Sequence, residues 1–357
     1  MNAGLIVIIL LLVLSILGIP IYLALGIGTL VALNMADMPF IVLPQKLFAG
    51  MNSSSLLAIP FFMLAGNIMS RSITGKLIDV SNALIGWIKG SLAVVTVLAS
   101  ALFGAISGSG VATASAVGGT TIPAMKEEGY PDHFAAAISG IAAILGPIIP
   151  PSITLIVYAS ITDLSVSKLF VGSVIPGILM AVGLIIYALF YGKKNDLPAH
   201  ERKSAKEVLL IFKDSIWALL MPVIILGGIF GGIFTPTESA AVAVVYALLV
   251  SLLIYKDIKI KDIPGIFVDG AISTATILML VGISKSSGYV ITTSGLPHQV
   301  LEVFSSFTNS TVVILLLLNI LFLVIGMLME ANAAIIMMTP ILLPLLDAFG
   351  IDPLQFG

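Results

Sequence analysis

Glycine and proline residues in one part of this chain are matched by glycine and proline residues further along. The sequence distance between matched residues is nearly constant and equals the distance from Gly50 to Gly270. In the same register, Gly75 falls opposite Gly295. Further pairs follow at nearly the same offset: Gly104 with Gly326, Pro123 with Pro344, Gly129 with Gly350 and, less tightly, Pro20 with Pro236. Two halves that are interrupted at matched places are typical of a fold built from structural repeats. The alternative is chance similarity between apolar segments, because Gly and Pro are frequent in membrane helices.

Composition places the chain in a lipid bilayer. Hydrophobic residues make up 59% of the 357 residues and charged residues 10%, and the mean hydropathy is +1.18. The net charge of −2, without a basic stripe, argues against a nucleic-acid partner. The chain has no cysteine and only three histidines, so we expect no disulfide, no transition metal and no cofactor.

Several apolar stretches are candidates for membrane helices. They are Leu5–Leu17, Leu92–Phe103, Val174–Tyr191, Trp217–Phe230, Ala240–Tyr255 and Val312–Met327. Several of them are shorter than the roughly 20 residues that a full crossing needs, which indicates broken or re-entrant segments. Because a helix satisfies its own backbone groups in lipid, the expected fold is all-α and polytopic. We interpret the first apolar run as a membrane helix, not as a removable signal peptide.

One polar stretch, residues 191–207, separates the two halves and carries five Lys and Arg residues. The positive-inside rule predicts that this linker is cytoplasmic. A second basic loop, Lys256–Asp262, corresponds in the first half to Ala36–Val42, which has no Lys or Arg. That asymmetry is what two inverted repeats would produce.

The order of elements is expected to be the same in both halves. In the first repeat, residues 1–190, we predict helices at 3–36, a re-entrant hairpin at 43–72, a broken helix at 90–126 and helices at 131–190. In the second repeat, residues 208–357, we predict helices at 213–254, a hairpin at 264–295 and a broken helix at 311–346. The counterpart of Phe134–Tyr191 would lie almost wholly beyond Gly357, so the register implies that either the natural chain is longer or the second repeat is truncated.

The predicted breaks are the candidate ion sites. Irregular backbone at membrane depth is tolerated where it is buried in protein or lines a cavity, and its carbonyl and hydroxyl oxygens suit a small hard cation. The candidate sodium ligands lie at the four breaks: Asn52, Ser53, Ser54, Ser107, Ser109, Gly110, Thr113, Ser273, Thr274, Thr276, Glu330 and Asn332. The alternative is close packing of helices through small residues, which also favours Gly, Ala, Ser and Thr.

The same breaks are the candidate substrate site. A half-helix that begins after a break presents unpaired N–H groups and a positive dipole end, so it can receive a carboxylate without a buried Arg or Lys. We predict an anionic substrate held near Ser54, Ser55, Ser109 and Thr274. The alternative is that these helix termini are capped by their own Ser and Thr side chains.

Ionisable residues inside apolar segments are costly unless they are paired or functional. For Glu330, a site role and a structural hydrogen bond are both open. Glu238 follows Pro236 at an expected helix start, which favours a capping role. Snorkelling to the interface is the favoured explanation of Lys285. No catalytic residue is expected, because a nucleophile elbow around Ser107 would need glycine at position 105, which is alanine.

Several of these segments together resemble the large membrane (M) subunit of the tripartite ATP-independent periplasmic (TRAP) transporters. The matching stretches are Ser55–Met69 (SLLAIPFFMLAGNIM), Gly104–Ala114 (GAISGSGVATA), Ile122–Tyr130 (IPAMKEEGY), Gly146–Ser152 (GPIIPPS) and Gly232–Ala240 (GIFTPTESA). Each motif is weak alone, but the combination is specific and extends over most of the chain. The family is longer at the C-terminus, where it carries a second proline-rich turn.

The resemblance implies a sodium-driven symporter of elevator type, multi-pass in the bacterial inner membrane. It implies two partner proteins, which are a small membrane (Q) subunit and a periplasmic substrate-binding (P) protein. It also implies hairpin tips that meet the broken helices, and small organic acids such as C4-dicarboxylates or sialic acid as substrates. The competing hypotheses are a stand-alone ion-coupled carrier of a related family and a passive channel.

Overall fold

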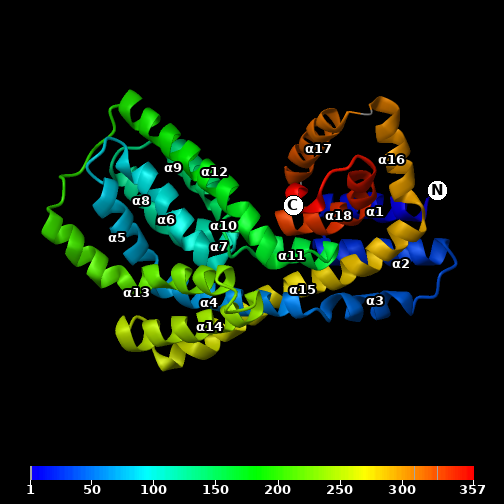
Figure 1. Cartoon of the computed structure of the whole chain (residues 1–357), viewed down its shortest axis with the longest axis horizontal. Coiled ribbons are helices and arrows are strands. Elements are labelled where there is room, and N and C mark those ends of the chain that lie inside the picture. The colour runs from blue at the N-terminus through cyan, green and yellow to red at the C-terminus, as the bar shows by residue number, and fades with distance from the viewer. Residues whose placement is uncertain (1, 309, 328) are drawn as a thin grey trace. The chain divides into compact units, whose positions relative to one another are not determined.

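The computed structural model describes residues 2–308, 310–327 and 329–357, and every regular element among them is a helix (Figure 1). The chain forms two compact units. Unit 1 comprises residues 1–56, 156–165 and 272–357, and unit 2 comprises residues 57–155 and 166–271. Each unit therefore takes segments from both predicted halves. The two inverted repeats stay a prediction, because each compact unit groups segments that contact one another, whether or not they correspond to each other as repeats.

Unit 1 is formed by α1 (Ala3–Ile16), α2 (Ile21–Met35), α3 (Val42–Met51), α16 (Leu296–Phe307), α17 (Thr311–Gly326), α18 (Ala331–Ala348) and α19 (Pro353–Phe356). Unit 2 is formed by α4 (Ala58–Ser72), α5 (Thr74–Ile85), α6 (Ser91–Ser107), α7 (Gly110–Thr113), α8 (Gly119–Glu127), α9 (Asp132–Ala143), α10 (Leu145–Ile148), α12 (Val166–Lys194), α13 (Ala205–Phe230) and α14 (Pro236–Leu249). Two α-helices contribute to both units, α11 (Ile153–Thr162) and α15 (Ile263–Thr293), as does the short 3₁₀ helix Ser54–Leu57.

Local sequence determines where the two long helices of the second half begin. The hydroxyl of Ser204 accepts the N–H of Glu207, whose carboxylate accepts the N–H of Ser204 in return. Thr235 and Glu238 form the same capping box at the start of α14. Such reciprocal caps satisfy backbone donors that a helix start leaves unpaired. The capping role predicted for Glu238 is confirmed.

Helix α6 is the centre of unit 2. Nearly all of its residues are buried, including Val95, Val97 and Phe103, each 0% exposed. A helix that is apolar all round must be enclosed on all sides. Helices α4, α5, α9, α10 and α12 pack against it. Gly104 makes the closest approach possible, because a Cβ there would lie 2.7 Å from the Cα of Gly146.

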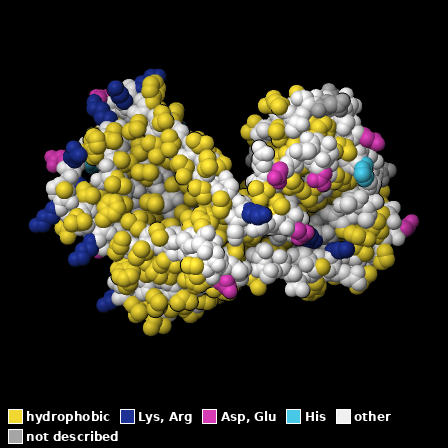
Figure 2. Space-filling view, viewed as in Figure 1, with side chains coloured by type: hydrophobic (Ala, Val, Ile, Leu, Met, Phe, Trp, Pro, Cys, Tyr) yellow, Lys and Arg dark blue, Asp and Glu magenta, His cyan; other side chains and the backbone are white. Residues whose placement is uncertain are grey.

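Among the described residues, five helices are long and apolar enough to cross a membrane, or up to eight spans if three bent helix pairs each count as one. Helix α12 exposes an apolar stripe at helical spacing, which includes Val171, Ile175, Ile178, Val182 and Ile186. Large exposed apolar surface is the surface that lipid covers. Lys and Arg side chains gather instead along the edge of unit 2 (Figure 2), where the linker between α12 and α13 runs (Figure 1). The expected all-α, polytopic membrane fold is confirmed.

The region 264–295 differs from its prediction. A hairpin broken at Gly270–Thr276 is expected from the sequence, but α15 is one continuous helix from Ile263 to Thr293. The hydroxyl of Thr276 bonds back to the carbonyl of Ile272 at 3.1 Å, which lets a polar residue stay inside a helix. No proline follows Pro264 within α15, so nothing removes a backbone donor from its middle.

The linker is also shorter than predicted. Helix α12 continues to Lys194 and α13 begins at Ala205, so only 195–204 of the predicted 191–207 is non-helical. The capping box at Ser204 fixes the start of α13 and therefore the C-terminal boundary of the linker. The other predicted breaks, Gly50–Ser55, Ser107–Ser115 and Met329–Asn332, overlap helix ends: α3 ends at Met51, α6 ends at Ser107 with α7 restarting at Gly110, and α18 begins at Ala331. Leu328, inside the predicted broken helix 311–346, lies outside the described residues.

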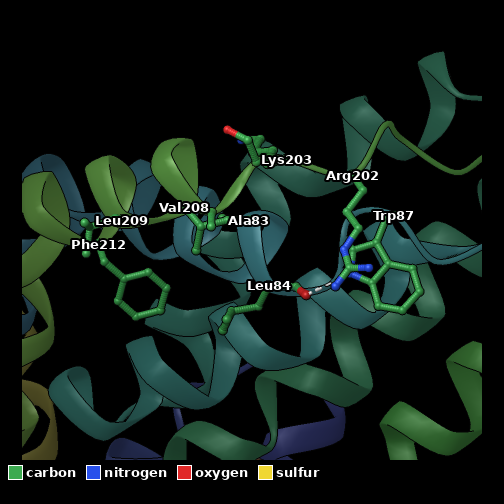
Figure 3. A pocket seen from close by; sticks show the side chains of 10 residues that line it. Ala83, Leu84, Trp87, Arg202, Lys203, Val208, Leu209 and Phe212 are labelled. Carbon is green, nitrogen blue, oxygen red and sulfur yellow. Dashed lines mark hydrogen bonds between the residues drawn. The ribbon is translucent and has the colours of Figure 1, made fainter.

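The linker ends at an open cavity of about 710 Å³ between α5 and α13 (Figure 3). The guanidinium of Arg202 stacks over the ring of Trp87 at 5.1 Å, and Leu84 and Phe212 form its apolar wall. The indole N–H of Trp87 donates to the carbonyl of Leu84 at 3.2 Å. An aromatic ring with a neighbouring cation is typical of the membrane–water interface. This cavity therefore marks the interfacial level of unit 2.

The lipid-facing stripe of α12 can be tested by spin labelling, because the chain has no native cysteine. A label at Ile178→Cys, where the side chain is 54% exposed, should collide readily with oxygen and rarely with a water-soluble nickel chelate. A label at Lys193→Cys, at the polar end of the same helix, should show the opposite ratio. Frequent collisions of the Ile178 label with the nickel chelate would contradict the lipid assignment.

Candidate functional site

The clearest candidate site is the break between α6 and α7 in unit 2. Helix α6 ends at Ser107 because Gly108 takes a left-handed conformation, with φ of +63°. A Cβ on Gly108 would also meet the carbonyl oxygen of Pro151 at 2.5 Å, so only glycine fits there. The chain then restarts at Ser109, whose hydroxyl caps α7 by accepting the N–H of Ala112 at 3.3 Å.

Three predicted ligands converge at this break. The hydroxyl oxygens of Ser107 and Thr113 lie 3.4 Å apart, and the Ser107 hydroxyl accepts the N–H of Ser109 at 3.4 Å. Thr113 donates its hydroxyl proton to the carbonyl of Ser109 at 2.8 Å. Ser107 and Thr113 are buried, and Gly110 and Ser109 are half-buried. The result is a compact set of neutral oxygens in an apolar core, and these oxygens are ligands that a small hard cation accepts.

Two glycines from other helices enclose this set. A Cβ on Gly66 of α4 would lie 3.2 Å from the Cα of Ser107. A Cβ on Gly146 of α10 would lie 2.7 Å from the Thr113 hydroxyl oxygen and 2.8 Å from the Ser109 carbonyl oxygen. Neither glycine is among the site residues predicted from the sequence. Both glycines lie in motifs that carry the family resemblance. The sequence therefore contained a signal for them, but no role was assigned to either glycine.

The predicted hairpin-tip residues belong to unit 1. Helix α3 ends at Met51, and Asn52 is its C-cap. The N–H of Ser53 donates to the carbonyl of Met51 at 3.0 Å, and Ser54 begins a short 3₁₀ turn that leads into α4. Asn52 and Ser54 are exposed, while Ser53 and Ser55 are half-buried. Since the tip and the 107–113 break belong to different units, an ion shared between them stays a prediction.

The second predicted ion site is divided between two helices of unit 1. Ser273, Thr274 and Thr276 lie within α15, not at a hairpin tip. The Thr276 hydroxyl is used within its own helix. The Thr274 hydroxyl oxygen, in contrast, is buried and has no hydrogen-bond partner among the described residues. A buried polar atom without a partner is unfavourable by roughly 1–3 kcal/mol.

Glu330 caps the helix that follows the second break. Its carboxylate accepts the N–H of Asn332 at 3.0 Å and the side-chain amide of Asn332 at 2.7 Å. Of the two interpretations left open by the sequence, the structural hydrogen bond is therefore present. The amide oxygen of Asn332 is buried and has no partner among the described residues. Asn332 and Thr274 thus each offer a free buried oxygen of the kind that a cation uses.

Comparison with known proteins identifies the family. The family model for the tripartite ATP-independent periplasmic transporter, DctM component, matches residues 8–357. The uncharacterised protein YgiK of Salmonella typhimurium is 41% identical over 95% of this chain and 79% of its own length. A putative TRAP transporter large permease protein of Haemophilus influenzae is 38% identical over 96% of this chain and 81% of its own length.

A third relative carries a substrate in its name. The C4-dicarboxylate TRAP transporter large permease protein DctM of Pseudomonas aeruginosa is 40% identical over 87% of this chain and 73% of its own length. The family model and these three relatives each match most of the chain, including the 107–113 break. This chain belongs to the DctM family of tripartite ATP-independent periplasmic transporters.

Proposed function

We propose that this chain is the large permease subunit of a sodium-coupled symporter that carries a small organic acid across the bacterial inner membrane. The observation that carries the proposal is the oxygen cluster of Ser107, Ser109 and Thr113, within a family match that covers residues 8–357. Neutral oxygens can bind sodium directly and need no buried counter-charge. The function is transport, and the relatives are named as permeases rather than as enzymes.

The substrate class follows from the relatives. Relatives are named for C4-dicarboxylate, sialic acid and 2,3-diketo-L-gulonate, which carry carboxylates, and another is named for isethionate, which is a sulfonate, so all of these compounds are organic acids. We therefore propose an organic acid for this chain, held between the broken segments near Ser54, Ser55, Ser109 and Thr274. The N–H groups that begin α7 suit a carboxylate, because the positive end of a helix lies there.

We further propose the partners and the mechanism that the family implies. A small membrane (Q) subunit would widen a fixed scaffold, and a periplasmic (P) protein would deliver the substrate. The two repeats would be inverted, and the segments that bear the breaks would move as an elevator against the scaffold. Sodium would be the coupling ion, bound with Gly110 at the first break and with Ser273, Thr276 and Glu330 at the second.

The first sodium site is tested by Ser107→Ala and Ser53→Ala. Each change removes one hydroxyl ligand, which is worth roughly 1–3 kcal/mol at an unsatisfied polar site, so about tenfold more sodium should be needed for half-maximal uptake. Sodium-dependent uptake into liposomes measures this shift. The matched control is Ser81→Ala, which removes a fully buried hydroxyl that bonds only within its own helix. Unchanged sodium dependence in both site variants would exclude the assignment.

The second sodium site is tested by Thr274→Val, which keeps the side-chain shape and removes the unpartnered hydroxyl. If that oxygen binds sodium, half-maximal uptake should again need about tenfold more sodium. Thermal stability without sodium should stay equal or rise, because a buried atom that lacks a partner has been removed. A loss of stability without sodium, together with normal sodium dependence, would indicate a structural hydroxyl instead.

The tripartite assembly is tested by reconstitution. The chain alone in liposomes, under a sodium gradient, should take up no free organic acid, and uptake should appear when the small membrane subunit and the periplasmic binding protein are added. Uptake of labelled acid into the liposomes measures both conditions. Robust uptake by the chain alone would favour the stand-alone carrier, and uptake without any sodium gradient effect would favour a passive channel.

A further inference from the structure

Unit 1 contains only two lysine or arginine residues, Lys46 and Lys285. Both line the same cavity, which has a volume of about 450 Å³ and is bounded by α3, α11, α15 and α18. All of the residues around it belong to unit 1. In such an apolar chain, a cation outside the polar loops calls for a functional explanation.

The two lysines are held at this cavity by a reciprocal contact between α3 and α15, which lie side by side in Figure 1. The ammonium of Lys46 lies 4.4 Å from the centre of the Tyr289 ring. One turn further along α3, the stem of Lys285 crosses Gly50, where a Cβ would lie 2.6 Å from its Cγ. Lys46 therefore contacts Tyr289, the later of the two residues of α15, and Gly50 contacts Lys285, the earlier one. The helices run antiparallel, and each presents one lysine to the same space.

Close packing fixes this register. The hydroxyl of Ser286 donates to the carbonyl of Leu43 at 2.8 Å. A Cβ on Gly282 would lie 3.2 Å from the carbonyl oxygen of Leu47. A side chain at position 282 or 50 would force the helices apart. These backbone-level contacts thus fix the register of α3 and α15, which brings both lysines to one cavity.

Neither ammonium group is paired with a carboxylate in the part of the chain that the structure describes. Unit 1 has six acidic residues, which are Asp37, Asp163, Glu302, Glu330, Asp347 and Asp352. Among the described residues, neither Lys46 nor Lys285 forms an ion pair with any of them. The nearby hydroxyls of Ser284 and Thr292 donate to carbonyls of their own helix. Among the described residues that line the cavity, the donors not used within their own helix are therefore the two ammonium groups and the Tyr289 hydroxyl.

We propose that this cavity binds the carboxylate of a small organic acid, with Lys46 and Lys285 as its binding residues. The inference rests on the proposed transport of organic acids, and it adds a positively charged subsite to the neutral oxygens at the breaks. A volume of about 450 Å³ lies within the range of roughly 300–1,000 Å³ that is usual for small-molecule sites. Snorkelling explains one lysine at an interface, but it does not explain why both cations of the unit share one cavity.

The first experiment uses the full transporter, with both partner proteins, in liposomes of neutral lipid. Lys46→Gln and Lys285→Gln should each raise the KM for succinate or N-acetylneuraminate, whichever is taken up, by about tenfold, because each removes a charge-assisted hydrogen bond. The half-saturating sodium concentration should not change. Lys285→Arg keeps the charge and should recover part of the affinity. The control is Lys206→Gln, at an exposed lysine of unit 2.

The outcomes separate the inference from the proposed function. If the wild-type assembly takes up acid and both glutamine variants keep its KM, the subsite is wrong and the transport function stands. If the wild-type assembly takes up no organic acid, the proposed function fails. A binding measurement on the purified chain then still decides the inference.

That measurement is protection of Lys46 and Lys285 from a lysine-acylating reagent, read by mass spectrometry. Succinate, 2,3-diketo-L-gulonate or N-acetylneuraminate should slow acylation of both lysines and leave Lys206 unaffected, whereas the neutral succinamide should not. A phospholipid headgroup has similar charge, so the assay is repeated with phosphatidylglycerol vesicles and no acid. Protection by the vesicles alone would assign the cavity to lipid and overturn the proposal, as would the absence of protection by any of the acids.

Discussion

The need to satisfy backbone polar groups in an apolar solvent governs this molecule. Hydrocarbon offers no partner for an open N–H or carbonyl, so the chain must be helical wherever lipid surrounds it. Every regular element among the described residues is a helix. The few interruptions are accordingly the informative places. At Ser107–Ser109 the freed groups are taken up by hydroxyls of the same segment and by Ile153, whose N–H donates to the carbonyl of Gly108 at 3.2 Å.

Glycine allows the interruptions to be buried. Gly104 and Gly146 bring α6 and α10 to backbone contact, and Gly66 brings α4 to Ser107. Without side chains at these positions, the helices close directly around the oxygen cluster, in which Ser107 and Thr113 are buried. Burial strengthens ion–oxygen attraction, because the local dielectric is low. Close packing through glycine also occurs in unit 1, where Gly50 and Gly282 let α3 and α15 approach each other. This approach holds Lys285 at its cavity.

Positively charged residues are also found in a few places. The polar linker and its neighbours carry cations at the edge of unit 2, where lipid headgroups and water can solvate them. Unit 1, by contrast, has two cations, both at one cavity. The first site uses neutral oxygens and the proposed subsite uses full charges. A cation and an anion that travel together could thus be held by separate chemistry, which is what coupled transport of an organic acid with sodium needs.

The sequence by itself determined the class of the protein, the positions of three breaks, the capping role of Glu238 and the family. Apolar runs, capping boxes and Gly–Ser clusters are local signals that act within a few residues. The prediction of a hairpin at 264–295 is wrong, because local propensity does not decide between a helix and a hairpin there. Side-chain bonds such as that of Thr276 support a helix just where small polar residues suggest a break.

Only the tertiary structure decided which oxygens and charges meet. It brought Gly66 and Gly146 to the 107–113 break, left the oxygens of Thr274 and Asn332 without partners among the described residues, and placed Lys46 and Lys285 at one cavity. These residues are separated by tens to hundreds of positions in the chain, and no periodicity links them. Helix packing sets such contacts through the shapes of whole faces, and a one-dimensional pattern does not specify those shapes.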